Sequence, residues 1–404
     1  MSTSQRVFIT GLGIITSIGK NAEENLQSLV TGKHGFRSLE VLDTVHRDSL
    51  SACEIKLEDR ALSEQAGVPL HEGFTRTSLL GLISLQEAIQ SAGLSPAEIK
   101  SSGLISATTT GGIREYEKHY YELMDPKLRG DFVRFTDTAT SGEHCERMAD
   151  HVGIKKYLGT ISTACSSSAN SLMHGAQLIK NNKLDRVICG GTEALSKFTL
   201  NGFNALMILD KQHCRPFDST RSGLNLGEGA AFLVLESEAE VNRKKRTPIA
   251  ELRGYGNAND AFHQTASSPD GAGAFSAMQL ALAAAQLQPG DIDYVNAHGT
   301  ATENNDLSEG LGMKRLFGPD IPYFSSTKPY TGHTLAAAGS IEAVYCLMAI
   351  NQGVIWPNLN YKNMMPELGI QPVTTLRHKM KLRYVLSNSF GFGGNTSSLL
   401  LASV

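Results

Sequence analysis

The sequence lacks several features that would place it in common protein classes. No apolar run in the 404 residues approaches the roughly 20 residues of a membrane-spanning helix. The six cysteines have no CxxC spacing, which argues against a structural zinc site or a disulfide framework. The net charge of −3 gives no basic field for nucleic acid or an anionic membrane. The N-terminal residues 1–9 show no basic-then-apolar signal pattern, so we expect a cytoplasmic protein.

The most informative stretch surrounds Cys165. A short apolar run at 157–161 leads into it, and a helical pattern of apolar residues at 169–179 follows. The serines at 166–168 can bond free N–H groups of the first helical turn. We expect Cys165 on a sharp strand-to-helix turn, where the helix dipole favours a thiolate that could attack a carbonyl. The alternative is a small buried cysteine, but a polar tripeptide suits an open turn better than a core.

The chain repeats its organisation after a charged run at 238–246, which ends before Pro248 and which we interpret as a solvated connector. Residues 92–99 and 285–292 each follow an apolar helix and precede a strand. Each half opens with a strand that runs into Gly-x-Gly, at 11–13 and 254–256. For Gly11 and Gly13, close backbone packing is a better explanation than a nucleotide loop. The helix that follows Cys165 has a counterpart after His333.

These repeated patterns predict an internally duplicated α/β fold, with halves at 1–246 and 247–404. Strands at 7–15, 103–107, 186–191 and 228–236 alternate with apolar helices at 21–30 and 79–92. We therefore expect layered helices on mostly parallel or mixed sheets. Two such halves facing each other would bring their loops to one shared site.

The second half carries its candidate chemistry in glycine-containing turns. His298 follows a strand end, and Lys328 and His333 lie in a loop that opens a helix. A helix N-terminus disfavours imidazolium, so His333 should stay a neutral hydrogen-bond donor. The turn at 387–396 could supply oxyanion-binding N–H groups, with Phe392 as a gate. Metal binding is the weaker alternative, because no carboxylate or second histidine lies at ligand spacing from either histidine.

By these residues the chain resembles the β-ketoacyl-acyl carrier protein synthases, the elongating, synthase II-like condensing enzymes of the thiolase-like fold. The resemblance spans essentially the whole chain and rests on several motifs that occur together in order. They are Thr163-Ala-Cys-Ser-Ser-Ser168, Arg215-Pro-Phe-Asp218, Leu226-Gly-Glu-Gly229, Val295-Asn-Ala-His-Gly-Thr300, Ser326-Thr-Lys328 with Thr331-Gly-His333, and Asn388-Ser-Phe-Gly-Phe-Gly-Gly394.

The resemblance implies a decarboxylative Claisen condensation. Cys165 would take an acyl group from the phosphopantetheine of an acyl carrier protein. His298 and His333 would then promote loss of CO₂ from malonyl-carrier protein. Backbone N–H groups of Cys165 and Phe392 would hold the tetrahedral oxyanion. The resemblance also assigns Lys328 to orienting the histidines with Glu342 as its partner, and substrate contacts to Thr300, Thr302, Phe203, Thr110, Thr265 and Phe390.

The resemblance further implies no resident cofactor and no metal, because phosphopantetheine arrives on the carrier protein. It implies acyl and malonyl thioesters as substrates. The expected assembly is a homodimer, with a heterodimer containing a chain-length factor as the other arrangement.

Four positions depart from the family pattern. Leu224 stands where the family usually has Phe near the gate, and Thr110 replaces a bulky aliphatic residue at the end of the acyl pocket. Met207 replaces an arginine that usually faces the carrier protein, and residues 72–78 keep only Arg76 of a usually basic cluster. The thinned positive patch predicts a dedicated carrier protein or other docking residues. The candidates for that docking are Lys127, Arg129 and Lys211.

Three other functions compete with this one. A non-catalytic partner subunit that only shapes the pocket typically loses the nucleophilic cysteine, whereas Cys165 is present here. A cysteine hydrolase would need a histidine with an orienting group and a place for water, which a dry acyl tunnel would exclude. A thiolase would need a second cysteine in the turn at 391–394, and that turn has none. Elongation of fatty acid, polyketide or polyene-type chains therefore fits the sequence best.

Overall fold

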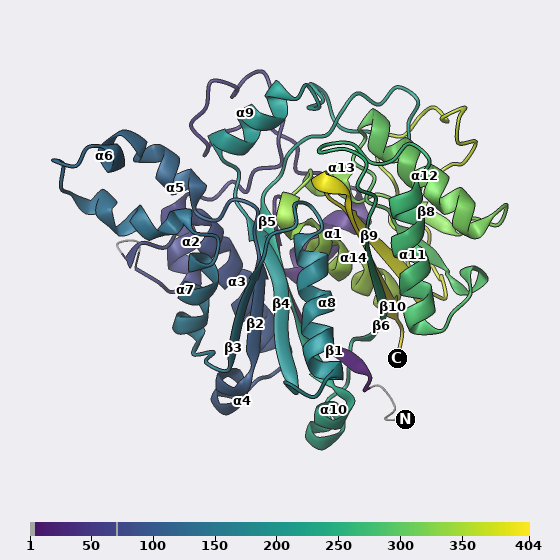
Figure 1. Ribbon diagram of the computed structural model, residues 1–404, viewed down its shortest axis with the longest axis horizontal. Coiled ribbons are helices and arrows are strands. Elements are labelled where there is room, and N and C mark those ends of the chain that lie inside the picture. Colours follow the sequence, from purple (N-terminus) through teal and green to yellow (C-terminus); the bar gives the residue numbers. More distant parts are fainter. Residues whose placement is uncertain (1–4, 70–71) are drawn as a thin grey trace.

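The fold is built on one ten-stranded mixed sheet flanked by helices, in a computed structural model that describes residues 5–69 and 72–404 (Figure 1). Residues 1–4, part of the stretch in which we looked for a signal, lie outside the described residues. The strands are β1 (Val7–Thr16), β2 (Gly103–Ala107), β3 (Tyr157–Ile161), β4 (Arg186–Glu193), β5 (Gly229–Ser237), β6 (Ala250–Asn259), β7 (Tyr294–Asn296), β8 (Tyr323–Ser325), β9 (Tyr384–Phe390) and β10 (Asn395–Ala402).

Helices occupy both faces of the sheet and its loop-bearing end. The α-helices are α1 (Ala22–Thr31), α2 (Asp59–Ala66), α3 (Arg76–Ser91), α4 (Pro96–Ser101), α5 (Ile113–Lys118), α6 (Tyr120–Met124), α7 (Glu143–Val152), α8 (Ser167–Lys180), α9 (Lys197–Ala205), α10 (Glu238–Lys244), α11 (Ala272–Ala285), α12 (Glu303–Phe317), α13 (Lys328–Thr331) and α14 (Ala338–Gln352). Short 3-10 helices are η2 (Asp131–Ala139), η3 (Pro289–Asp291), η4 (Leu335–Ala337) and η5 (Phe392–Gly394).

The strand order confirms the predicted duplication. The sheet runs β3-β2-β4-β5-β1-β6-β10-β9-β7-β8. Read from its two edges, the first half is β3-β2-β4-β5-β1 and the second is β8-β7-β9-β10-β6, which is the same order with five added to each number. In each half the outer strands pair in parallel and the inner strands pair antiparallel, so the sheet is mixed.

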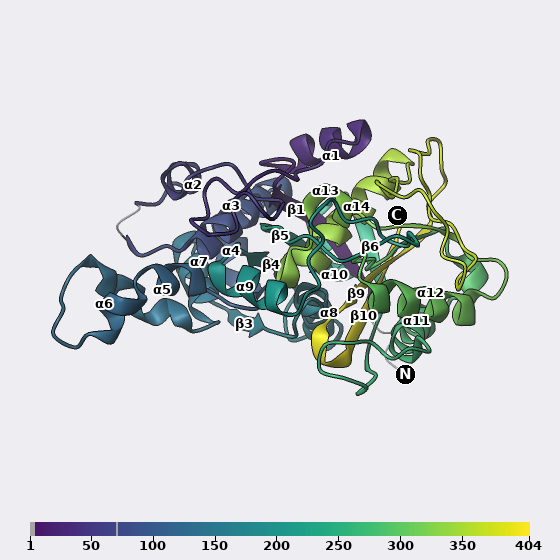
Figure 2. The same cartoon turned by 90° about the horizontal axis from the view of Figure 1, so that it is seen from above.

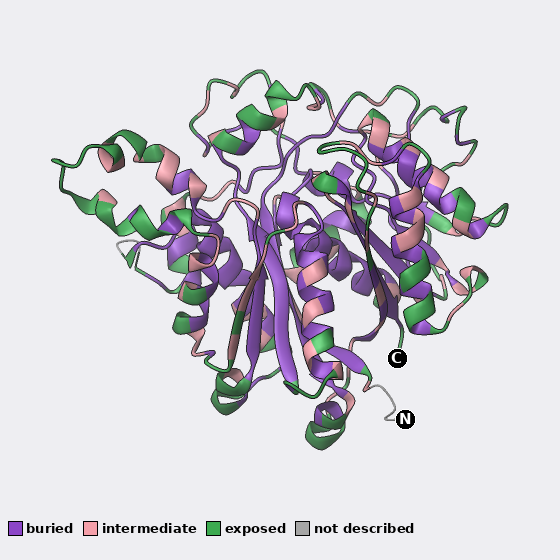
Figure 3. Ribbon diagram, viewed as in Figure 1, coloured by how far each residue is buried: buried purple, intermediate pink, exposed green. Residues whose placement is uncertain are grey.

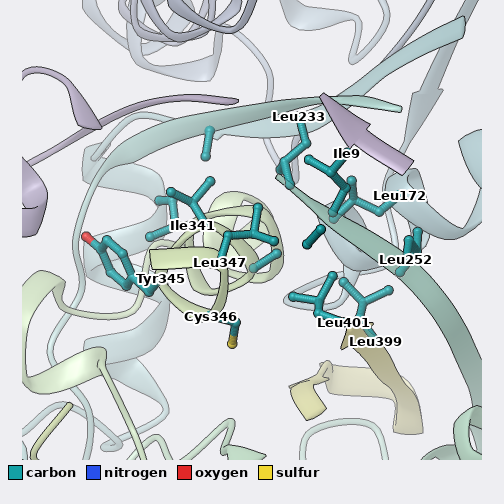
Figure 4. Close-up of a cluster of buried hydrophobic side chains, with 14 of the residues drawn as sticks. Ile9, Leu172, Leu233, Leu252, Ile341, Tyr345, Cys346, Leu347, Leu399 and Leu401 are labelled. Atoms are coloured by element: carbon teal, nitrogen blue, oxygen red, sulfur yellow. The ribbon is translucent and has the colours of Figure 1, made fainter. Parts of the chain in front are cut away.

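Helices α8 and α14 form the central layer between the two halves of the sheet (Figure 2). Helix α14 is buried on every side from Ala338 to Ala349, as expected for a helix that is apolar all round. It contacts strands of both halves, and the surrounding core is drawn in Figure 4. The labelled residues of that core are Ile9, Leu172, Leu233, Leu252, Ile341, Tyr345, Cys346, Leu347, Leu399 and Leu401.

The outer helices α3 and α11 pack tightly onto the glycines that open each half. A Cβ atom on Gly13 would lie 2.1 Å from the carbonyl oxygen of Ser84 in α3. A Cβ atom on Gly256 would lie 2.2 Å from the carbonyl oxygen of Ala277 in α11. Gly13 therefore serves close backbone packing, as predicted, and Gly256 does so at the matching place in the second half.

The charged run at 238–246 is exposed at residues 239 and 242–245, as expected for a solvated segment, but it is more than a connector. Most of it forms α10, and the Arg246 guanidinium contacts Glu236 at 2.5 Å and Glu98 at 2.8 Å. Buried Arg186 bonds the same two carboxylates, so the run is tied into the base of the first half. The sheet also continues across this point through the β1–β6 pairing. The division into halves at residue 246 stays a prediction.

Most strands and the central helices are buried, whereas much of α6 and the outer face of α9 are exposed (Figure 3). Between residues 40 and 69 the chain forms α2, which packs on α3. Within residues 5–69 and 72–404 no helix has the length and apolar character needed to cross a bilayer.

Candidate active site

Cys165 lies in the predicted sharp turn between β3 and α8. Ala164, just before it, has a left-handed φ of 51°, an uncommon conformation for a residue with a side chain. The serine hydroxyls brace this turn, because Ser166 donates to the Thr163 carbonyl and Ser167 accepts from the Thr163 N–H. The serines therefore hold the strained turn that presents Cys165, and Ser166 makes no side-chain cap bond of the kind we expected.

The charge state of Cys165 differs from the sequence-based expectation. Burial raises the pKa of the Cys165 thiol to about 12, against a smaller lowering by the Lys328 charge. The thiol is only 5% exposed and packs in an apolar cluster that includes Leu195 and Leu335. A helix N-terminus contributes typically about 0.3–1 kcal/mol, and here desolvation outweighs it. The resting side chain is therefore a thiol, so a nucleophilic Cys165 would have to lose its proton when it attacks.

This protonation state predicts the pH dependence of alkylation. Below the thiol pKa the thiolate fraction rises about tenfold per pH unit, so iodoacetamide should modify Cys165 about tenfold faster for each unit between pH 7 and 9. Peptide mass spectrometry of timed samples measures the rate at this residue. A rate that levels off near neutral pH would show a stabilised thiolate and contradict the effect of burial.

The glycine-rich turn after β9 closes over Cys165. The backbone N–H of Phe392 bonds the Cys165 thiol, and the Phe392 ring stacks on Phe203 of α9 with centroids 5.8 Å apart. A Cβ atom on Gly391 would lie 2.9 Å from the Thr163 carbonyl oxygen and 3.1 Å from the Cys165 nitrogen. The two turns therefore fit together only because residue 391 has no side chain.

Replacing Gly391 by alanine should therefore slow acylation of Cys165 by about tenfold or more, because displacing an oxyanion donor costs about that much. The φ of Gly391 is −110°, so alanine adds crowding without backbone strain. Single-turnover acylation followed by intact-protein mass measures the rate.

Gly393→Ala serves as the control in the same turn. Nothing lies within 4 Å of its added Cβ atom, although its φ of +79° makes alanine cost about 1 kcal/mol of stability. Equal loss of acylation in both variants would mean that stiffness of the turn, rather than its fit against Cys165, is what matters.

Lys328 fixes the orientation of His298. Its ammonium Nζ lies 3.2 Å from His298 Nδ1, and it donates to the His298 carbonyl oxygen at 2.6 Å. An ammonium has donors only, so Nδ1 must accept and the proton of neutral His298 sits on Nε2. Nε2–H is then the donor available to a substrate oxygen. Lys328 also pairs with buried Glu342 at 2.5 Å, which gives Glu342 the partnership that we predicted.

His333 is held by the loop that precedes β5. Its backbone N–H donates to the Asn225 carbonyl at 2.7 Å, and its carbonyl accepts from the Gly227 N–H at 3.0 Å. Its ring meets that of His298 edge-on, with centroids 5.3 Å apart. Its Nδ1 atom is buried without a protein partner among the described residues.

Both histidines are neutral in this setting. Burial lowers the pKa of His298 and of His333 well below the usual value, and the Lys328 charge lowers both further. The predicted neutrality of His333 is confirmed, but its main cause is desolvation rather than a helix dipole. Two neutral imidazoles can donate hydrogen bonds to one developing oxyanion without exchanging protons with it.

Cys165, His298 and His333 line one cavity of about 330 Å³ between the two halves, as the duplicated fold predicted, and Lys328 lies behind His298. Of the predicted substrate contacts, five also line this cavity: Phe203, Thr265, Thr300, Thr302 and Phe390. Thr110 does not line this cavity, and its hydroxyl donates instead to buried Glu193 at 2.9 Å. Leu224 forms part of the cavity wall beside Met207 and Ile208.

Sequence reasoning missed two buried carboxylates that hold the catalytic loops. Glu309 of α12 accepts the backbone N–H groups of His298 and Gly299, each at 2.8 Å. Glu193 accepts from the three threonines at 108–110. The sequence does contain a pattern that could have identified Glu309. Asp306 and Glu309 are two acidic residues three positions apart on the helix that directly follows the His298 loop, and so they could reach that loop.

One predicted role is wrong. Arg76 is no remnant of an exposed docking patch, because it is fully buried and pairs with Glu228 at 2.6 Å and Asp59 at 2.8 Å. It anchors the start of α3. Lys127, Arg129 and Lys211 are exposed, so their docking role stays a prediction. Across 5–69 and 72–404, no three His, Cys, Asp or Glu side chains gather where they could hold a metal ion.

Comparisons with known proteins identify the family of the chain. The family model "Beta-ketoacyl synthase, N-terminal domain" matches residues 4–240, and "Beta-ketoacyl synthase, C-terminal domain" matches residues 249–362. A 3-oxoacyl-[acyl-carrier-protein] synthase 2 of Staphylococcus aureus is 31% identical over 413 aligned residues, covering 99% of both chains. The tetracenomycin polyketide synthase ketoacyl synthase alpha subunit of Streptomyces glaucescens is 33% identical, covering 98% of this chain and 97% of that one.

A solved structure, the ishigamide ketosynthase/chain length factor, superposes with a TM-score of 0.92 at 29% identity, with full coverage of both chains. The thiolase-like fold predicted from the sequence is confirmed by this likeness. With a cysteine, two histidines and a lysine meeting between duplicated halves, and with both family models matching in order, the chain belongs to the β-ketoacyl synthase family of carbon–carbon bond-forming condensing enzymes.

Proposed function

We propose that the enzyme extends an acyl chain held as a thioester on Cys165, using malonyl-acyl carrier protein as the two-carbon donor. The observation that carries this assignment is the meeting of Cys165, His298 and His333 in one cavity, with Lys328 fixing the tautomer of His298. A nucleophile for acyl transfer and a pair of neutral donors for an enolate are the two requirements of this reaction.

In the loading step, the Cys165 sulfur attacks the carbonyl carbon of the incoming acyl thioester. The new bond joins that carbon to Cys165, the bond to the carrier sulfur breaks, and the thiol proton passes to the carrier sulfur. Backbone N–H groups of Cys165 and Phe392 stabilise the tetrahedral oxyanion. Since Phe392 already donates to the thiol, this turn is close enough to serve the reacting carbon.

In the condensing step, malonyl thioester loses CO₂ and its carbonyl oxygen becomes an enolate oxygen. His298 Nε2–H and His333 donate to that oxygen, which offsets its developing charge. The enolate carbon attacks the acyl carbon on Cys165, forming the new C–C bond and breaking the C–S bond. The departing Cys165 thiolate takes a proton from water, and the β-ketoacyl chain leaves on the carrier. Thr300 and Thr302, whose hydroxyls lie 2.9 Å apart, border the cavity where the arm would lie.

The assembly and setting are also proposals. The carrier protein delivers phosphopantetheine, so the enzyme needs no resident cofactor, and we place it in the cytoplasm. Strand β3 lies at the edge of the sheet with Leu158 41% exposed, which suits pairing with a second chain. A homodimer or a heterodimer with a chain-length factor would use this edge. The substrate is a fatty acyl chain or a polyketide or polyene-type chain.

The direct test mixes the enzyme with an acyl-carrier protein and malonyl-carrier protein, then measures the mass of the carrier-bound product. We expect a β-ketoacyl product that forms with release of CO₂. If the acyl chain returns as a free acid, the enzyme is a hydrolase. If neither product forms, even with a candidate partner subunit added, the chain is a non-catalytic member of its fold.

A further inference from the structure

Asn395 begins β10 directly after the turn that carries Phe392, and it is bonded to the first half of the chain as well. Its main-chain carbonyl accepts the Gly391 N–H at 2.8 Å, which closes the turn after β9. Its side-chain Oδ1 accepts from the hydroxyl of Ser166, the residue directly after Cys165, at 2.6 Å. One residue is therefore bonded to both turns that supply the N–H donors of the oxyanion site.

Further polar side chains surround this contact. Asn170 of α8 donates to Asn395 Oδ1 at 3.0 Å and to the Thr163 hydroxyl at 2.8 Å. Asn257 of β6 donates to Asn395 Oδ1 at 3.0 Å and to the Ser397 hydroxyl at 2.9 Å. The Ser397 hydroxyl in turn donates to Asn170 at 2.8 Å. We call this set the polar network, which consists of Thr163, Ser166, Asn170, Asn257, Asn395 and Ser397.

The polar network lies outside the wall of the catalytic cavity. Among the described residues, that wall includes Cys165, Gly391 and Phe392 but no member of the network. The network is also not the sole link between the halves, because the β1–β6 pairing and buried α14 join them elsewhere. Asn395 can therefore affect the reaction only through the two turns to which it is bonded.

The two oxyanion donors belong to different halves of the chain, so no single element fixes their separation. Cys165 precedes α8 and Phe392 follows β9, and α8 contacts β10 where the halves join (Figure 2). Ser166 and Asn395 are 229 positions apart, yet they form a hydrogen bond between the two turns. A misplacement of about 1 Å can slow an enzymatic step by about 10²-fold, so this bond should matter for the rate.

We infer that Asn395 is a positioning residue that sets the distance between the N–H groups of Cys165 and Phe392. The inference rests on the proposed function, in which both N–H groups stabilise the oxyanion formed at the acyl thioester. Three donors converge on Asn395 Oδ1, so its side chain is held in one orientation. Asn395 itself touches neither the substrate nor the reacting atoms.

The test measures how fast an acyl-carrier protein acylates Cys165, followed by intact-protein mass. Asn395→Ala keeps the main-chain bond to Gly391 but removes the side-chain bond to Ser166. It should lower the maximal acylation rate by about tenfold or more, because the two donors no longer converge on the oxyanion. The donor concentration that gives half this rate should stay within about twofold of wild type, since the network does not line the cavity.

Ser397→Ala is the matched control within the polar network. Ser397 bonds Asn170 and Asn257, but among the described residues its side chain bonds neither Ser166 nor the turn after β9. Its acylation rate should therefore stay within about twofold of wild type. Ser166→Ala removes the same contact from the other half, so the double variant Ser166→Ala/Asn395→Ala should be no slower than the slower single variant.

Decarboxylation separates positioning from a structural role. His298 is held by Lys328, and His333 by the loop that precedes β5, and neither set of contacts involves the polar network. Adding Asn395→Ala to the Cys165→Ala variant should therefore leave the decarboxylation of malonyl-carrier protein within about twofold.

The possible failures are distinguishable. If Asn395→Ala is acylated as fast as wild type, the inference is overturned and the proposed function stands; Ser166→Ala decides in the same way should Asn395→Ala not fold. Equal slowing of Ser397→Ala, or a parallel loss of decarboxylation, would show that the network only stabilises the fold and would also overturn the inference. If no donor acylates the wild-type enzyme, the proposed function fails, and the inference with it.

Discussion

Cys165→Ala should abolish the acyl adduct and lower condensation by about 10⁴-fold or more, because no other group on the cavity wall can form the thioester. Decarboxylation of malonyl-carrier protein should persist, because His298, His333 and Lys328 do not depend on the thiol for their contacts. Release of CO₂ without a condensed product, measured with labelled malonyl-carrier protein, would separate the two half-reactions.

Cys145→Ala is the matched control for this variant. Cys145 is also a buried free cysteine, but it packs in the cluster behind α3 rather than at the cavity. It should keep the adduct and the condensed product. If Cys165→Ala lost decarboxylation as well, with its fold intact by circular dichroism, then decarboxylation at His298 and His333 would depend on the thiol. That result would contradict our assignment of acyl transfer and decarboxylation to separate groups.

Lys328→Met should impair both activity and stability. Activity should fall about 10²-fold or more, because His298 loses the donor that fixes its tautomer and a positioned proton donor is worth about that factor. Removing one member of a buried pair costs about 3–5 kcal/mol of unfolding free energy. We expect a value near the lower end, since burial already raises the pKa of Glu342 to about 7 and the unpaired carboxyl can protonate. Chemical denaturation and steady-state kinetics measure the two effects.

The double variant Lys328→Met/Glu342→Gln separates the two consequences. Replacing the carboxylate by an amide of the same shape removes the unpaired buried charge, so much of the lost stability should return. Activity should stay low, since His298 Nδ1 still lacks its donor. Recovery of activity together with stability would mean that Lys328 acts only as a structural ion-pair member.

The parts of the site that local sequence could predict are those determined by turns. The apolar run before Cys165 and the small polar residues after it were enough to predict the turn, and Ala164 shows why it is strained. The paired Gly-x-Gly openings predicted the duplication, because each must let a helix pack against its strand. The joint placement of Cys165, His298 and His333 followed from that duplication.

What the sequence could not reveal depends on burial by distant residues. The thiol of Cys165 is protonated because leucines far along the chain exclude water from it. In the sequence, Arg76 has the appearance of a surface cation, because its buried partner Glu228 lies 152 positions later. The run 238–246 is mostly exposed, as expected, but local sequence does not show that Arg246 pairs with Glu98 and Glu236. Each error concerns a charged or titratable group whose partner lies in another element.

Intact-protein mass after mixing the enzyme with a panel of acyl-carrier proteins tests the central claim most directly. We predict one acyl adduct per chain, mapped by peptide analysis to Cys165, and the chain that loads fastest will identify the natural substrate class. Fast loading of polyunsaturated or oxygenated chains would indicate a polyene or polyketide pathway. The absence of any adduct from every donor, with a candidate partner subunit present, would contradict the account.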